Sequence, residues 1–173
     1  MNPMEQVRIE KVTLNIGAGK EQAVLDRGIS VIKSLTGFEP QKCIATKRIP
    51  AWGVRPGLPV GCRLTLRGDQ AEKMLRRALK AKDFTLKPSN FDNAGSIAFG
   101  IPEHIDIEGA QYDPKIGVMG LQVCVTLEKP DFHVKRRRAR PAAVGKKHRI
   151  TQVESMAFMK ERFGVTVAEE EKA

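Results

Sequence analysis

Four stretches of the chain alternate large apolar residues with polar or small ones, and this pattern constrains the fold most. The stretches are residues 12–16, 62–67, 97–101 and 121–127. Successive side chains of a strand point to opposite faces of a sheet, so each stretch predicts a half-buried β-strand. Another strand is predicted to begin at Pro40 and to run into a long loop. We therefore expect a sheet with one buried face and one open face.

Three helices are predicted between and after these strands. The first covers residues 21–36 and ends at Gly37, and the second begins at an N-cap Asp69 with Glu72 completing a capping box. The third follows a capping box of Thr151 and Glu154. Its inward-facing residues are expected to be Val153, Met156, Ala157 and Phe163, with Gly164 ending it. This order of elements predicts an α+β fold: a single domain over residues 1–173, mainly antiparallel, with helices on one face.

The charge of the chain favours a polyanionic partner. Its 173 residues suit one domain, and 41% of them are hydrophobic, which is enough for a sizeable core. The net charge is +10 and the isoelectric point is about 9.8. Positive charge at this density favours binding to nucleic acid. Because only 5% of residues are aromatic, a face built mainly on base stacking is not expected.

The cysteines and the apolar runs favour a cytoplasmic protein. Cys43, Cys62 and Cys124 are odd in number, widely spaced and inside apolar runs, so we expect buried, reduced thiols rather than disulfides or zinc ligands. We find no apolar run long enough to span a bilayer and no signal peptide, so no membrane partner is expected.

The residues expected on the open face of the sheet are cationic, hydroxyl or amide groups, with no carboxylate among them. Such groups suit contacts to phosphates and ribose 2′-hydroxyls rather than a stacking platform. The predicted open-face residues are Lys11, Thr13, Asn15, Lys42, Thr46, Arg63, Thr65, Arg67, Gln122 and Thr126.

A long basic loop, residues 46–61, carries the only tryptophan of the chain, Trp52. Its cations are Lys47, Arg48 and Arg55, and prolines stiffen it. Cations beside an aromatic ring suit an RNA contact. The alternative is an ordinary hairpin tip with Trp52 folded onto the core, and the residues alone leave both readings open.

Two other segments stand out by charge. Residues 129–149 are strongly basic and predict an RNA-binding extension that is disordered without counter-charge. Its candidate contacts are Lys135, Arg136, Arg137, Arg138, Arg140, Lys146, Lys147 and Arg149. Residues 102–120 form an acidic island, which we interpret as a structured loop that meets a basic protein. An acidic tail at residues 168–173 is expected to be loose.

Two other classes of function fit the sequence less well. The Gly17–Lys20 turn has a Gly-x-Gly but lacks a third glycine, so a strand-to-helix turn is favoured over a nucleotide site, although its amides could hold an RNA phosphate. An RNA-modifying enzyme would have to use Glu103, His104 and Asp106, whose spacing matches neither an HExxH site nor a calcium-binding loop. We predict no catalytic residue, metal or cofactor.

Five motifs, in order along nearly the whole chain, resemble a known family. They are Val12-Thr13-Leu14-Asn15-Ile16-Gly17-Ala18-Gly19, Trp52-Gly53-Val54-Arg55 with the run to Gly61, Leu64-Thr65-Leu66-Arg67-Gly68, Phe99-Gly100-Ile101-Pro102-Glu103-His104, and Tyr112-Asp113-Pro114. The family is the universal large-subunit ribosomal protein L-five, in its archaeal form. Phe38 stands where the family usually has glutamine, and Lys129-Pro130-Asp131 replaces a typical Arg-Pro-Gly.

The resemblance implies a non-enzymatic, monomeric component of the central protuberance of the large subunit. Its open face would hold 5S rRNA and help attach it to the large-subunit rRNA. Its loop, here Lys47 to Gly57, would approach P-site tRNA. It would also meet a small-subunit head protein across an intersubunit bridge, for which residues 102–120 are the candidate segment.

Overall fold

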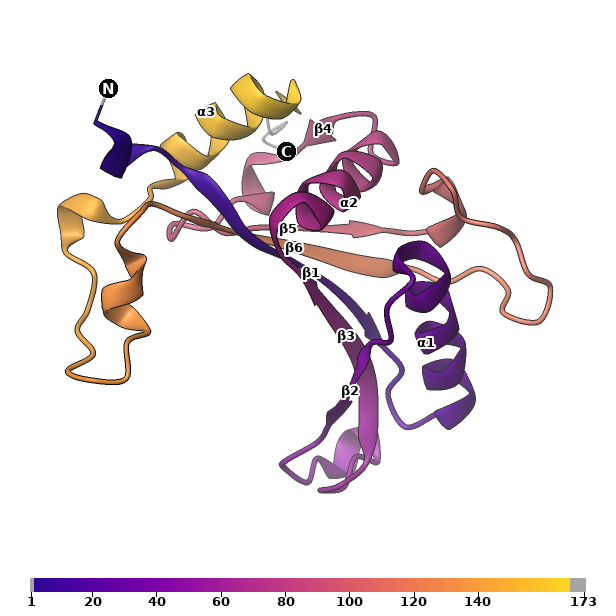
Figure 1. Cartoon of the computed structure of the whole chain (residues 1–173). Coiled ribbons are helices and arrows are strands. Elements are labelled where there is room, and N and C mark those ends of the chain that lie inside the picture. The colour runs from indigo at the N-terminus through magenta and orange to yellow at the C-terminus, as the bar shows by residue number, and fades with distance from the viewer. Residues whose placement is uncertain (1, 169–173) are drawn as a thin grey trace.

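The centre of the protein is a five-stranded antiparallel sheet with the strand order β2-β3-β1-β6-β5, as seen in a computed structural model that describes residues 2–168 (Figure 1). Its strands are β1 (Arg8–Gly17), β2 (Gln41–Ile44), β3 (Pro59–Leu66), β5 (Ile97–Ile101) and β6 (Leu121–Glu128). A separate parallel pair consists of β4 (Thr85–Leu86) and β7 (Thr166–Val167). The α+β class and the mainly antiparallel sheet are confirmed. The predicted loose tail lies outside the described residues from position 169 onward.

Three helices accompany the sheet: α1 (Gln22–Thr36), α2 (Gly68–Lys80) and α3 (Gln152–Phe163). Helix α1 contacts β1 and β3, α2 contacts β1, and all three helices contribute to one apolar core. Short 3₁₀ turns occupy Pro3–Glu5, Pro50–Trp52, Pro88–Asn90, His104–Asp106, Phe132–Lys135 and Lys146–His148. Val12 and Leu14 of β1 are fully buried in that core, whereas the intervening Thr13 is only half-buried. The alternation of the sequence is therefore an alternation of burial.

Two helix ends agree with the predicted caps. Helix α1 ends at Gly37, whose φ of 76° is the left-handed conformation that glycine adopts without strain. At the start of α3, the backbone N–H of Glu154 donates to the Thr151 hydroxyl at 3.4 Å, and the N–H of Thr151 donates to the Glu154 carboxylate at 2.9 Å. The capping box is thus complete.

The predicted start of α2 is wrong. The helix begins at Gly68 with Arg67 as N-cap, and no side chain caps it. Glu72 instead accepts hydrogen bonds from Arg76 at 3.0 Å and from Arg162 of α3 at 2.9 Å. These bonds lower the pKa of Glu72 and join α2 to α3. The carboxylate therefore serves helix packing rather than a helix end.

The predicted inward face of α3 is correct for Phe163 and partly for Met156, which is half-buried against the core. Val153 is 75% exposed and Ala157 is also exposed, whereas the buried residues are Ser155, Met159 and Phe163. Ser155 is tolerated inside because its hydroxyl donates to the Gln152 carbonyl at 2.8 Å. Because one residue of the buried stripe is polar, the apolar pattern of the sequence did not indicate which face of α3 is buried.

The cysteines are free thiols, but only Cys62 is buried. Burial raises the pKa of the Cys62 thiol to about 11, so this thiol stays protonated and unreactive. Cys43 and Cys124 are half-exposed, which corrects the prediction of three buried thiols. Within residues 2–168, no helix is long and apolar enough to cross a membrane.

Candidate nucleic-acid interface

The face of the sheet opposite the helices gathers polar side chains in a defined register. Thr13 lies between Thr65 and Cys124, and Asn15 lies between Arg63 and Gln122. Directly paired residues point to the same face, so these side chains share the open face with Lys11 and Thr126, which also pair. The Asn15 amide donates to the Gln122 side-chain oxygen at 3.4 Å. The structure therefore brings together the predicted residues of β1, β3 and β6.

Two predicted open-face residues do not belong to this group. Lys42 pairs with Cys62, whose side chain is buried beneath the helices, so Lys42 lies on the other face at the sheet edge. Gln41, opposite Arg63, is the polar residue of β2 on the open face, and it was not among the predicted contacts. Thr46 lies beyond the end of β2, in the loop. The β2 stretch is too short and irregular for its alternation to fix which residues face which side.

The open face also contains carboxylates, contrary to the prediction. The register of β1 against β6 shifts between Ile9 and Lys11, which leaves Glu10 as an extra residue, and Glu128 pairs with Arg8. The side chains of Glu10 and Glu128 are only 7% and 10% exposed. Their nearest partners are arginines: Arg67 is 3.2 Å from Glu10, and Arg8 is 2.8 Å from Glu128. The Lys11 ammonium lies farther from Glu10, at 3.7 Å.

Arg136 joins this cluster from the basic extension. Its Nη2 lies 2.8 Å from Glu10 and 2.9 Å from Glu128. Beyond Arg136 the extension folds back on itself. The rings of Phe132 and His148 meet edge to face at 5.8 Å, and His148 Nε2 lies 2.6 Å from the Pro130 carbonyl oxygen. In the structure, residues 129–149 thus form a loop fixed to one end of the open face.

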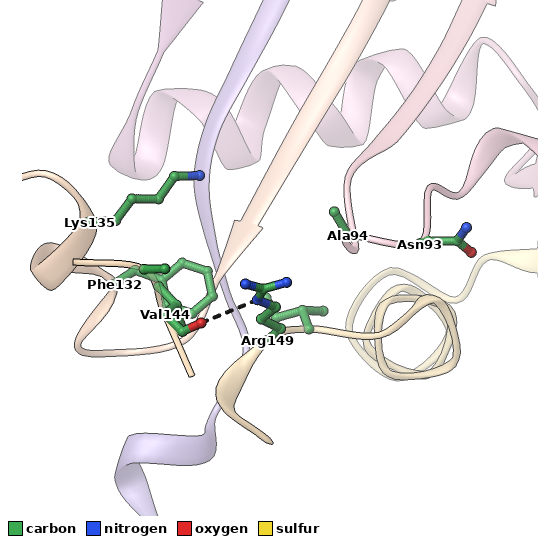
Figure 2. A pocket seen from close by; sticks show the side chains of 8 residues that line it. Asn93, Ala94, Phe132, Lys135, Val144 and Arg149 are labelled. Atoms are coloured by element: carbon green, nitrogen blue, oxygen red, sulfur yellow. Dashed lines mark hydrogen bonds between the residues drawn. The ribbon is translucent and has the colours of Figure 1, made fainter. Parts of the chain in front are cut away.

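The other predicted contacts of this extension are exposed, and two of them line a hollow. Lys135 and Arg149 border a cavity of about 560 Å³ beside Phe132 and Val144, across from Asn93 and Ala94 (Figure 2). The Arg149 guanidinium donates through Nε to the Val144 carbonyl at 3.2 Å. Exposed cations around an apolar wall are chemically suited to an RNA backbone. The exposed cations of the extension are Lys135, Arg136, Arg137, Arg138, Arg140, Lys146, Lys147 and Arg149.

The basic loop forms the tip of the β2–β3 hairpin, away from residues 129–149 and 102–120 (Figure 1). Trp52 is 69% exposed, so the alternative with its ring on the core is wrong. Ile49 and Val54 exchange backbone hydrogen bonds of 3.0 and 3.2 Å, and Gly57 donates to the Ala45 carbonyl at 3.0 Å. Strand β3 already begins at Pro59, so the loop is shorter than predicted. It is a hydrogen-bonded tip whose cations, Lys47, Arg48 and Arg55, are exposed.

The turn after β1 is not a free phosphate cradle. The backbone N–H groups of Ala18 and Gly19 both donate to the Val60 carbonyl, at 2.9 and 3.1 Å. These amides are therefore used to hold the turn against β3, and the nucleotide-site alternative loses two of its donors.

The acidic loop is built around structural contacts. His104 is 2% exposed, and its Nδ1 accepts a hydrogen bond from the Met119 N–H at 3.3 Å. Arg77 of α2 donates to the Glu108 carbonyl at 2.7 Å, and Lys80 lies 3.1 Å from the Glu108 carboxylate. Within residues 2–168, no group of three or more His, Cys, Asp or Glu residues could hold a metal ion. His104 thus serves the loop's fold, and the basic face of α2 is partly used to hold the loop.

Comparisons with known proteins give one consistent result. Residues 2–55 match the family model described as Ribosomal protein L5, and residues 59–158 match the model that describes the C-terminus of the same ribosomal family. The chain is 44% identical to the Large ribosomal subunit protein uL5 of Sulfurisphaera tokodaii, over 98% of this chain and 96% of that protein. It is 46% identical to the protein of the same name from Nanoarchaeum equitans, over 96% of this chain and 98% of that protein. The Nitrosopumilus maritimus protein of that name is 42% identical, over 96% of each chain.

Proposed function

The chain belongs to the ribosomal protein L5 family, a structural and non-enzymatic constituent of the large ribosomal subunit, and we propose that it binds 5S rRNA through the open face of its sheet. The observation that carries this proposal is the helix-free face on which Thr13, Asn15, Arg63 and Thr65 lie in register. Hydroxyl, amide and guanidinium groups can donate hydrogen bonds to the phosphates and 2′-hydroxyls of RNA. Lys11, Gln122 and Gln41 extend the same face.

The other surfaces receive separate roles in this proposal. The basic loop, residues 45–58, contacts P-site tRNA through Lys47, Arg48, Trp52 and Arg55. Residues 129–149 contact the large-subunit rRNA, so that the protein attaches 5S rRNA to it in the central protuberance. The acidic loop, residues 102–120, meets a small-subunit head protein. Residues 1–173 act as one domain and as a monomer within the cytoplasmic ribosome.

A binding measurement tests the open face. Arg63 is exposed in the middle of that face, so we expect Arg63→Ala to weaken binding to a 5S rRNA transcript by roughly tenfold at low salt. The loss should shrink as salt rises, because phosphate contacts release counterions. Filter binding over a salt series gives both quantities.

The matched control is Lys33→Ala, which removes one exposed cation from α1 on the helix side. We expect it to change affinity far less than Arg63→Ala. If both variants lose affinity equally, 5S rRNA responds only to net charge and the open face is not its site.

A further inference from the structure

At one end of the open face, two carboxylates are largely buried and three arginines are exposed to solvent. The carboxylates of Glu10 and Glu128 are 7% and 10% exposed, whereas the side chains of Arg8, Arg67 and Arg136 are 59%, 59% and 47% exposed. The arginines therefore cover the carboxylates and form the surface that an approaching RNA meets first. We call these five residues the arginine–carboxylate cluster.

The contacts leave each arginine with unused donors. A guanidinium has five N–H groups. Arg136 bonds both carboxylates through Nη2 alone, and Arg67 bonds Glu10 through Nη1 alone. Arg8 uses Nε and Nη2, both on the same Glu128 oxygen, at 2.9 and 2.8 Å. Each side chain is thus fixed at one edge while further N–H groups remain without an acceptor in residues 2–168.

The cluster also joins four separate parts of the chain. Arg8 and Glu10 belong to β1, Glu128 ends β6, and Arg67 precedes α2. Arg136 comes from the basic extension, so the carboxylates set the position of that extension relative to the sheet. Three guanidinium groups are held close together at the junction of the two predicted RNA surfaces.

We propose that Glu10 and Glu128 are positioning residues that hold Arg8, Arg67 and Arg136 as a preformed site for RNA phosphodiester groups. The proposal rests on RNA binding by the open face. A long arginine side chain loses conformational freedom when it binds, and a carboxylate that fixes it beforehand reduces this cost. The acidic residues therefore increase affinity for a polyanion, although their own charge opposes it.

An alternative role for the two carboxylates predicts the opposite change in RNA affinity, which makes the proposal testable. If the carboxylates only neutralise the arginines, removing one negative charge strengthens RNA binding. If they position the arginines, the same change weakens binding. The direction of the change in affinity therefore decides between the two readings.

The experiment compares Glu128→Gln and Glu10→Gln with the parent protein, using a 5S rRNA transcript and an unrelated RNA duplex. Each glutamine keeps the side-chain shape but loses the charge-assisted bonds. We expect binding to 5S rRNA to weaken by about five- to tenfold in either variant. Tighter or unchanged binding by both variants overturns the proposal. Thermal melting of each variant checks that it is folded before its affinity is compared with that of the parent.

Glu72→Gln is the matched control. Glu72 also bonds two arginines, Arg76 at 3.0 Å and Arg162 at 2.9 Å, but it lies between α2 and α3 rather than on the open face. The change in net charge is identical. We expect this variant to bind RNA as tightly as the parent or slightly more tightly. An equal loss in Glu72→Gln and Glu128→Gln also overturns the proposal.

A charge-conserving variant provides a second test. Arg136→Lys keeps the charge but has three N–H donors on one nitrogen instead of five, so bonding both carboxylates leaves it fewer donors for a phosphate. We expect weaker binding than the parent. Arg27→Lys, on α1 and without an ion pair in residues 2–168, should bind like the parent. Parent-like binding by Arg136→Lys contradicts the positioning role.

The two RNAs separate this proposal from the proposed function. A parent protein that binds the duplex as well as 5S rRNA refutes 5S recognition. The rank order of the variants on the duplex still decides whether Glu10 and Glu128 position the arginines, because both RNAs carry the same phosphodiester groups.

Discussion

The arginine–carboxylate cluster and the basic loop at residues 45–58 are both cationic, but they hold their charges differently. Arg8, Arg67 and Arg136 each lie within 3.2 Å of a carboxylate oxygen. Lys47, Arg48 and Arg55 form no ion pair within residues 2–168. In the cluster the side chains are fixed by acidic neighbours, whereas in the loop only the backbone is fixed, by its own hydrogen bonds.

This difference has consequences for binding. Fixed guanidinium groups lose little freedom when they meet a phosphate, but they accept only one arrangement of it. Unpaired side chains on a rigid tip lose more freedom on binding but adapt to varied positions. We infer that the cluster suits a permanent RNA contact and that the loop suits a contact that forms and breaks repeatedly.

The largest expected effect comes from removing the loop cations together. Changing Lys47, Arg48 and Arg55 to alanine should speed dissociation of P-site tRNA from assembled ribosomes by on the order of tenfold, since their phosphate contacts are lost. Affinity for 5S rRNA, measured by filter binding, should stay near that of the parent. A collapse of 5S affinity with unchanged tRNA dissociation would place the loop in the 5S site and abolish the comparison.

A smaller effect is expected on folding stability, and it separates the two regions. Arg136→Ala removes one cation from two largely covered carboxylates, so it should lower the free energy of unfolding by about 1 kcal/mol. Arg48→Ala, at the exposed loop, should leave it unchanged. Urea unfolding measures both variants, and an equal cost at the two sites would show that the cluster is no better anchored than the loop.

The smallest expected effect is the change in stability on removing the tryptophan. Because Trp52 is 69% exposed, Trp52→Ala should change the free energy of unfolding by less than about 0.5 kcal/mol. The same variant should still weaken tRNA retention if the ring stacks on a base. A large loss of stability would mean that the ring supports the fold and that the tip is not a free binding surface.

Much of the fold could be predicted because burial alternates along residues 12–16 of β1, 62–66 of β3, 97–101 of β5 and 121–127 of β6, as the sequence does. Prediction failed where the pairing is irregular, at Glu10 and beside Ile44. The first irregularity brings a carboxylate to the open face. The second leaves β2 too short for its alternation to assign Lys42 to a face. No local sequence signal reports either of them.

The candidate site was predictable to the extent that it depends on strand faces. The exposure of Trp52 was not, because an aromatic ring on a loop can fold either way. The α2 cap failed for a different reason: Arg162 of α3, distant in the chain, takes the Glu72 carboxylate that a local motif assigns to the helix start. Contacts between distant segments are absent from any local pattern.

The register shift at Glu10 has a consequence for how β1 tolerates changes in length. Ile9 pairs with the buried Leu127 and Arg8 pairs with Glu128, so both keep their faces although one residue is inserted after them. In a strictly regular strand of the same sequence, that insertion would turn arginine toward the core and isoleucine toward solvent. Deleting the inserted residue would instead leave both faces unchanged and remove only the carboxylate. The bulge therefore restores the alternation of side chains on both sides of Glu10. It lets the strand carry an additional acid without changing which residues face the core.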